Sequence, residues 1–252
     1  MKRPDHYHRI GYDRRIKLEW VDLAAQLLLE GCSEKEIEEQ LLETLKPFLS
    51  VGKSKVNRGS GEKAKTILMK TWVRVPANLV PLRNEGISII ESMPRHSRLP
   101  VHWGMTIAAY PFWGAVASNV GRVLRLQKTI TLKTVSRRVG EQYGERSTAV
   151  DSARRVMMSM LDWGVIQRGK RWGTYSPTRR NSANSEKLVS WLFEALMWSQ
   201  GKMQASVDQL KGSPVLFPFK LPQISGRQIA ATSDRLEHVT HGLNQELLVL
   251  HD

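Results

Sequence analysis

The stretch that decides the fold runs from residue 129 to residue 177 and reads TITLKTVSRRVGEQYGERSTAVDSARRVMMSMLDWGVIQRGKRWGTYSP. It contains two segments with helical periodicity, separated by Gly144 at a position that suits the end of a helix. Thr131 can cap the first helix, and either Ser147 or Thr148 can cap the second. The pattern therefore predicts two consecutive helices.

The second predicted helix separates an apolar face from a polar one. Five apolar residues repeat at the spacing of one helix face and predict its buried stripe: Val150, Ala153, Met157, Met160 and Leu161. We expect the opposite face to carry Thr148, Ser152, Arg155 and Ser159, flanked by Asp151 and Arg154. Small residues let a helix approach DNA closely, and arginine can hydrogen-bond guanine or a phosphate. These features are typical of a helix that reads the major groove.

Two β-prone segments follow this helix, at residues 165–168 and 171–175. They flank Gly169-Lys170, which we expect to form a tight turn. Cations near the tip of such a hairpin can contact the DNA backbone or the minor groove. A helix pair followed by a basic hairpin is the arrangement of a winged helix-turn-helix, which the sequence predicts over residues 128–180.

Charge supports a nucleic-acid partner for this segment. The chain has 38 basic and 24 acidic residues, a net charge of +14, and such an excess attracts polyanions. Residues 122–180 hold four acids and fourteen basic residues: Arg122, Arg125, Lys128, Lys133, Arg137, Arg138, Arg146, Arg154, Arg155, Arg168, Lys170, Arg171, Arg179 and Arg180. Much of the excess is therefore concentrated in less than a quarter of the chain. The alternative is a basic surface that only keeps the protein in solution.

Ten residues are the candidate contacts to duplex DNA. Ser147 and Thr148 can donate to a phosphate at the start of the second helix. The complete set is Lys133, Arg137, Ser147, Thr148, Ser152, Arg154, Arg155, Arg168, Lys170 and Arg171. The alternative interpretation is a winged helix that is purely structural or that docks another protein.

The rest of the chain predicts a mainly α fold. We expect a flexible basic arm over residues 1–15 and a helical bundle over residues 16–127, with an exposed Gly-, Ser- and Lys-rich loop at residues 50–65. That loop can be a solvated linker or a second phosphate contact. Ser33 and Glu36 form the pattern of a capping box, and Pro111 should break the most apolar helical stretch.

Residues 181–252 are predicted to form a C-terminal segment that packs on the core. A long amphipathic helix is expected from residue 186 to residue 210. Pro214 and Pro218 then favour an extended segment, and two short strands are expected around Gly242.

Several classes of function are excluded by what the chain lacks. No apolar run is long enough for a membrane helix, and no apolar stretch follows the basic N-terminus, so we expect a cytoplasmic protein with no membrane partner. Cys32 is the single cysteine, which excludes an internal disulfide and a cysteine-rich zinc site. There is no P-loop, GxGxxG, HExxH or GxSxG pattern. We therefore expect no enzymatic activity, cofactor, metal or small-molecule substrate.

Four features together resemble the BrxA-like family of BREX phage-defence systems. They are LLLEGCSEKEIEEQLLE at residues 27–43, the interrupted helical middle, the winged helix closing on DWGVI at residues 162–166, and LFPF at residues 216–219 followed by HVTHGL at residues 238–243. The resemblance implies an all-helical bundle joined to a winged helix that binds DNA. It assigns DNA contact to Arg154, Arg155, Arg168, Lys170 and Arg171.

Three functional hypotheses follow. The first is a bacterial DNA-binding accessory component of a phage-defence complex, which docks onto other proteins of a larger assembly. The second is a transcription regulator or replication initiator that uses the same winged helix as a dimer on a palindromic or repeated site. The third is an RNA-binding or scaffolding protein, which the sequence favours least because most aromatic residues are predicted to be buried.

Overall fold

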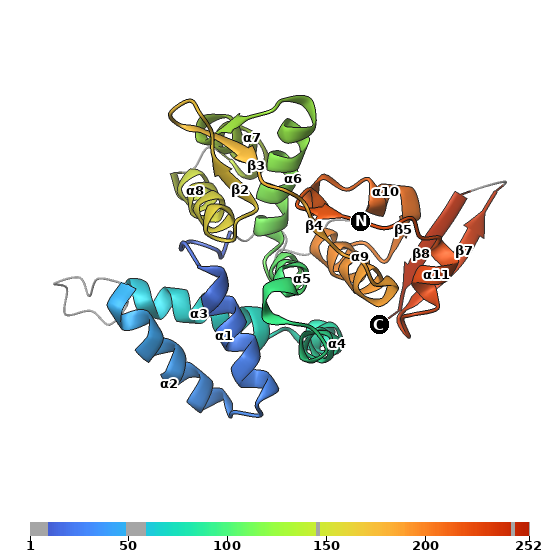
Figure 1. The fold of residues 1–252 in the computed structure, drawn as a ribbon, viewed down its shortest axis with the longest axis horizontal. Coiled ribbons are helices and arrows are strands. Elements are labelled where there is room, and N and C mark those ends of the chain that lie inside the picture. Colours follow the sequence, from blue (N-terminus) through green and yellow to red (C-terminus); the bar gives the residue numbers. More distant parts are fainter. Residues whose placement is uncertain (1–9, 49–58, 145–146, 243–244, 252) are drawn as a thin grey trace.

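The computed structural model describes residues 10–48, 59–144, 147–242 and 245–251. The fold is mainly helical, with small sheets in the second half of the chain (Figure 1). In the first half, the helices are α1 (Leu18–Leu29), α2 (Glu34–Leu45), α3 (Ser60–Trp72), α4 (Val80–Glu91), α5 (Leu99–Ala109) and α6 (Pro111–Leu126), with short 3-10 turns at Lys46–Phe48, Ala77–Leu79 and Arg95–Ser97.

The boundaries of these helices follow local sequence. The predicted capping box is confirmed, because the Ser33 side chain accepts from the Glu36 backbone while the Glu36 carboxylate accepts from the Ser33 backbone. The predicted break is confirmed as well, since α5 ends before Pro111 and α6 begins at it. The loop expected at residues 50–65 falls partly outside the described residues. Its second part was predicted wrongly, because α3 already begins at Ser60.

A helix pair and a small antiparallel sheet follow α6. The elements are β1 (Ile130–Thr131), α7 (Leu132–Tyr143), α8 (Ser147–Asp162), β2 (Ile166–Arg168) and β3 (Thr174–Pro177). The strand order is β1-β3-β2, with Ile130 paired to Tyr175 and Gln167 paired to Ser176. Thr131 caps α7 as predicted, by accepting from the Thr134 backbone.

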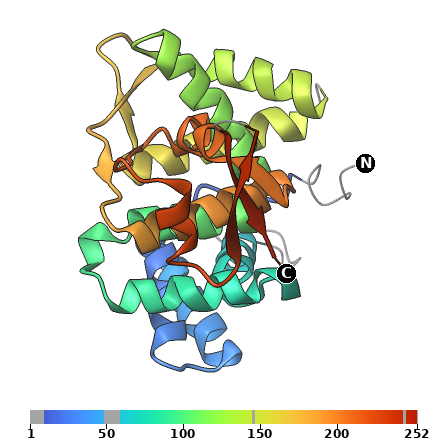
Figure 2. The ribbon, with the colours of Figure 1, turned by 90° about the vertical axis from the view of Figure 1, so that its right-hand side faces the viewer.

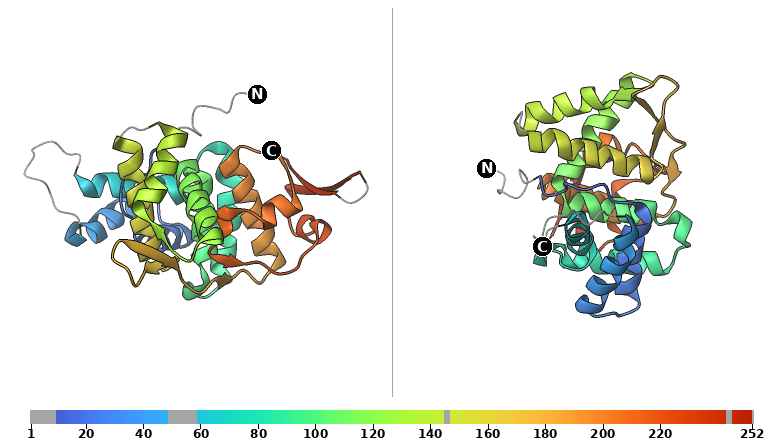
Figure 3. Two further views of the ribbon diagram at one scale, coloured as in Figure 1. Left: turned by 90° about the horizontal axis from the view of Figure 1, so that it is seen from above. Right: turned by 90° about the vertical axis from the view of Figure 1, so that its left-hand side faces the viewer.

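The C-terminal elements lie on one side of a buried helix, α9, while α5 packs on its other side (Figures 1, 2 and 3). Its elements are β4 (Asn181–Ser182), α9 (Glu186–Gln200), β5 (Gln204–Ser206), α10 (Val207–Lys211), a 3-10 turn (Pro214–Leu216), β6 (Phe219–Lys220), α11 (Gly226–Ala230), β7 (Leu236–His241) and β8 (Gln245–Leu250). β4 pairs with β6 in parallel, and the order β5-β8-β7 forms an antiparallel sheet. The two short strands expected around Gly242 are thus confirmed.

Two expectations for the C-terminal part were wrong. The helix predicted over residues 186–210 ends at Gln200, because Gly201 adopts a left-handed conformation with φ of +61° and β5 follows. The segment predicted to be extended begins instead with the 3-10 turn at Pro214–Leu216, in which proline occupies the first position and needs no donor.

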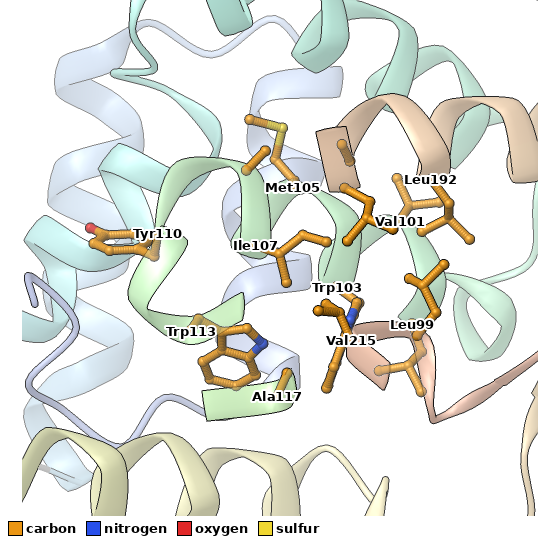
Figure 4. Close-up of a cluster of buried hydrophobic side chains, with 14 of the residues drawn as sticks. Leu99, Val101, Trp103, Met105, Ile107, Tyr110, Trp113, Ala117, Leu192 and Val215 are labelled. Atoms are coloured by element: carbon orange, nitrogen blue, oxygen red, sulfur yellow. The ribbon is translucent and has the colours of Figure 1, made fainter. Parts of the chain in front are cut away.

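Trp103 lies at the centre of the core (Figure 4). It is fully buried, and edge-to-face contacts join its ring to Trp113 at 5.7 Å and to Trp163 at 6.2 Å between centroids. Phe217 and Phe219 contact the same ring, each at 5.8 Å. One aromatic cluster therefore connects α5, α6, the end of α8 and the C-terminal segment.

The C-terminal segment also lies directly on α6. A Cβ atom on Gly121 would sit only 2.0 Å from the carbonyl oxygen of Pro214, so the absence of a side chain is what admits this backbone. The prediction that the segment packs on the core is in agreement with this contact.

The segment before α1 packs against α8. Tyr12 is 1% exposed, so the expectation of a loosely ordered arm was wrong for residues 10–15; residues 1–9 lie outside the described part of the chain. The Ile16 amide donates to Ser159 Oγ at 2.8 Å, and Trp163 Nε1 donates to the Ile16 carbonyl at 3.0 Å. Arg15 and Asp162 add an ion pair at 2.5 Å.

A buried carboxylate, Asp22, links α1 to α5. It accepts from Arg95 Nε at 2.5 Å, from Arg98 at 3.1 Å and from His102 Nε2 at 3.1 Å. Burial alone would raise the pKa of Asp22, but the hydrogen bonds from His102, Arg95 and Arg98 outweigh burial and hold this pKa far below its usual range. Asp22 is therefore ionised in the folded protein at any ordinary pH.

Lowering the pH from about 7 to about 5 is expected to reduce the free energy of unfolding through His102. Burial lowers the pKa of this histidine, which is 1% exposed, so the ring is neutral in the fold and takes up a proton on unfolding below about pH 6.5. The contribution is present above the unfolded pKa and is lost as the pH falls, at up to about 1.4 kcal/mol per pH unit.

Urea unfolding at a series of pH values measures this slope. His102→Gln keeps a donor toward Asp22 but cannot titrate, and it should flatten the dependence between pH 7 and pH 5. Equal slopes for the wild type and for His102→Gln would contradict the assignment.

Candidate nucleic-acid interface

The helices α7 and α8 and the hairpin β2–β3 lie together at one end of the molecule, opposite α2 (Figure 1). α7 packs on α8, and both contact α6. We refer to residues 130–177 as the terminal unit. Nine of the ten predicted DNA-contact residues are exposed on this unit: Lys133, Arg137, Ser147, Thr148, Arg154, Arg155, Arg168, Lys170 and Arg171.

The tenth residue, Ser152, was assigned wrongly. It is 2% exposed and lies on the buried face of α8, and Ser159, expected on the same polar face, is fully buried. The buried hydroxyl of Ser159 accepts a hydrogen bond from the backbone amide of Ile16, which is far away in the sequence. Val150 is 38% exposed rather than part of the stripe, and Leu161 is only half-buried. The buried face of α8 consists of Ala149, Ser152, Ala153, Val156, Met157, Ser159 and Met160.

The start of α8 presents two hydroxyl groups to solvent. The helix begins at Ser147, so Ser147 and Thr148 both lie in its first turn and are exposed. The two residues before Ser147 are outside the described part of the chain. The prediction that Ser147 or Thr148 caps α8 was therefore wrong, because both residues lie within the helix. In the first turn of a helix, backbone amides lack partners inside the helix and can bind an anion together with these hydroxyl groups.

The tip of the hairpin is a closed turn of five residues, from Gly169 to Gly173. The predicted hairpin is confirmed, but the two-residue turn at Gly169-Lys170 is wrong. The Gly169 amide donates to the Thr174 carbonyl at 2.9 Å, the Thr174 amide donates to the Arg171 carbonyl at 3.1 Å, and Gly173 has a φ of +72°. This turn exposes Lys170 and Arg171, and it leaves Trp172 97% exposed.

The cations of the terminal unit and its flanks are largely without partners. Arg137 pairs with Glu141, four residues along α7. Arg146 lies outside the described residues. For the other twelve basic side chains between residues 122 and 180, the described part of the chain offers no ion pair and no hydrogen bond: Arg122, Arg125, Lys128, Lys133, Arg138, Arg154, Arg155, Arg168, Lys170, Arg171, Arg179 and Arg180.

Outside residues 122–180, most of the described lysines and arginines pair with a neighbouring acid, whereas Lys70, Arg83, Lys187, Lys202, Lys211, Lys220 and Arg227 have no ion pair among the described residues. Arg74 pairs with Glu34 and Glu38, both at 2.5 Å. Arg235 pairs with Glu194 at 2.8 Å and with Glu85 at 2.7 Å. Unpaired lysines and arginines are thus more frequent on and around the terminal unit than in the rest of the described chain, and they are available there to an external polyanion.

A hollow of about 700 Å³ lies apart from these cations, next to Asp22. Three acids line it, and each is already paired within the protein: Glu19 with Lys17, Asp22 with Arg95, and Asp162 with Arg15. The lining also includes His102, which is hydrogen-bonded to Asp22, and the exposed His96, which has no ion pair among the described residues.

Comparisons with known proteins returned no match among protein-family models, curated proteins or solved structures. Within residues 10–48, 59–144, 147–242 and 245–251, every helix is too short or too polar to cross a membrane. Over the same residues, no three His, Cys, Asp or Glu side chains gather closely enough to hold a metal ion.

Proposed function

We propose that this protein is a non-enzymatic, cytoplasmic DNA-binding protein that grips duplex DNA through a winged helix-turn-helix over residues 128–180. In this proposal α7 and α8 are the helix pair, and the hairpin β2–β3 is the wing. The order of elements supports it, because the helix pair is followed directly by the hairpin and β1 closes the sheet beside β3.

The observation that carries the proposal is the set of twelve cations without partners on and around this unit. Each lysine or arginine that meets a phosphate releases counterions from DNA, and the affinity then depends steeply on salt. An arginine already bound to a carboxylate contributes less, because the pair must first be broken. No ion pair with a described residue has to be broken for five of these cations: Arg154, Arg155, Arg168, Lys170 and Arg171.

The exposed residues divide into two kinds of contact. Arg154 and Arg155 lie on α8, from which an arginine can reach guanine edges or phosphates in the major groove. Ser147 and Thr148 suit a phosphate at the start of α8, and the wing cations suit the adjacent backbone or minor groove. Ser152 is removed from the proposed interface because it is buried.

The place of the protein in a bacterial phage-defence complex is part of the proposal and rests on the resemblance of its sequence to the BrxA-like family. In that role the helical bundle would dock onto other protein components. A winged-helix transcription regulator or replication initiator has the same interface and differs in binding as a dimer to a repeated site. An RNA-binding or scaffolding role agrees less well with the structure, because six of the eight tryptophans are less than 5% exposed.

Replacing Arg154 and Arg155 together with alanine is expected to weaken binding to duplex DNA. Each lost base contact should cost about 1–3 kcal/mol, and each lost phosphate contact less. The measurement is a titration of a labelled random duplex at several salt concentrations, with a single strand and a duplex RNA as competitors. The wild type should prefer duplex DNA, and the double variant should show a shallower salt slope.

The matched control removes two charges from the opposite end of the molecule. Lys35→Ala with Lys46→Ala changes the net charge equally, but both lysines lie on or beside α2 (Figure 1) and should leave DNA affinity nearly unchanged. Equal loss in both double variants would show that only net charge matters. A folded Arg154 and Arg155 variant with wild-type affinity would remove α8 from the interface.

A further inference from the structure

Trp172 stands apart from every other tryptophan of the chain. It is 97% exposed, whereas Trp20, Trp72, Trp103, Trp113, Trp163 and Trp191 are less than 5% exposed and Trp198 is half-buried. An aromatic ring in full contact with water loses the favourable free energy that burial would provide. Nothing in the packing of the described residues accounts for a tryptophan at this position.

The turn that carries Trp172 holds it away from the core. The Arg171 carbonyl accepts from both the amide and the hydroxyl of Thr174, at 3.1 and 2.5 Å. A Cβ atom on Gly169 would lie 2.4 Å from Thr174 Oγ1, so the turn closes tightly around that side chain. Trp172 is thus presented at the tip by an ordered backbone, which lowers the entropy cost of binding something there.

The surroundings of Trp172 indicate a nucleic-acid base as its occupant. Lys170 and Arg171 precede it in the same turn and have no ion pair with the described residues. The other large apolar side chains of the hairpin, Ile166 and Tyr175, are buried. The tip therefore presents one aromatic ring beside cations, which suits base stacking plus phosphate contact, whereas a membrane surface or a protein groove favours a wider apolar face.

We propose that Trp172 stacks on a base that is exposed at an interruption of duplex DNA, such as a single-nucleotide gap. This inference rests on the proposed function and names its preferred substrate class. In an intact duplex the ring must first separate two stacked bases, whereas a gap already offers a free base face. The cations of the wing and of α8 then hold the flanking duplex on either side of the gap.

The experiment compares two duplexes of identical sequence, one intact and one with a central single-nucleotide gap. Stacking on a base is worth about 1–3 kcal/mol, which is about a 5- to 150-fold difference in affinity. The wild type is expected to bind the gapped duplex about tenfold or more tightly than the intact one. Trp172→Ala should abolish this preference and leave affinity for the intact duplex within about twofold, while Trp172→Phe should retain most of it.

A fluorescent base analogue gives a second readout. With 2-aminopurine placed next to the gap, the wild type should change its emission on binding, and Trp172→Ala should not. Trp172→Ala removes no charge, so the salt slope should stay at the wild-type value. Arg154→Ala with Arg155→Ala should lower the affinity for both duplexes and preserve their ratio.

The outcomes separate this inference from the proposed function. If the wild type binds both duplexes equally and Trp172→Ala behaves like it, the stacking role is overturned and the DNA-binding proposal stands. If the wild type binds neither duplex, both fail. Trp172-dependent binding to phosphatidylserine vesicles, with no Trp172-dependent gap preference, would overturn the inference in favour of a membrane surface.

Discussion

Replacing Asp22 with asparagine is expected to lower the free energy of unfolding by about 3–5 kcal/mol. The substitution preserves the shape of the side chain but removes the charge that Arg98 and His102 face. Arg98 is 9% exposed and His102 is 1% exposed, so water cannot replace the hydrogen bonds that these side chains would lose. The loss of stability arises because the buried guanidinium of Arg98 keeps its charge but no longer faces a carboxylate.

Urea unfolding at pH 7.5 measures the loss, and a melting temperature lower by about 6–20 °C should accompany it. Asp151→Asn is the matched control, because Asp151 is exposed on α8 and makes no ion pair with the described residues. It should change the free energy of unfolding by less than about 0.5 kcal/mol. If Asp22→Asn is as stable as this control, the carboxylate does not hold α1 and α5 together.

Trp103→Ala is expected to cost about 3–5 kcal/mol of the free energy of unfolding. Its ring is fully buried and contacts four other aromatic rings, which come from three regions of the chain. Removing the ring leaves a cavity that Trp113, Trp163 and the two phenylalanines can fill only by moving helices that are otherwise well packed.

The same substitution at Trp172 supplies the control. Trp172→Ala deletes an identical side chain from a position that is 97% exposed, so the free energy of unfolding should stay within about 0.5 kcal/mol of the wild type. Comparable losses at the two positions would contradict the central place of Trp103 in the core. Circular dichroism of both variants before unfolding establishes that each starts from a folded state.

Local signals in the sequence predicted most of the helices. The Ser33–Glu36 capping box, the Thr131 cap and the break at Pro111 depend on atoms within a few residues of one another, and all three are confirmed. Gly201 carried a local signal for the end of α9 that the prediction of a longer helix did not use. The two short strands expected around Gly242 are likewise present.

The errors in the candidate site have a non-local cause. The hydroxyl of a serine on a helix can bond either to water or to a buried donor, so the sequence alone does not decide its burial. The buried donor for Ser159 is the amide of Ile16, 143 residues away in the sequence. The stripe of α8 was misplaced for a related reason, because Ala149 and Val150 are both apolar and only packing decides between them. The arginines were easier to place, since a long charged side chain is rarely buried without a partner.

The contacts that Ile16 makes with Ser159 and Trp163 have a consequence for engineering and for evolution. The terminal unit is not separate from the rest of the protein. The residues that precede α1 pack on the end of α8, and the rings of Trp103 in α5 and Trp113 in α6 contact Trp163. Cut out along the sequence, residues 128–180 would expose surface that the intact protein covers. We therefore expect that residues 128–180 do not fold as an independent domain. Recombination between genes, or grafting in the laboratory, should move this unit successfully only together with the helices that surround it.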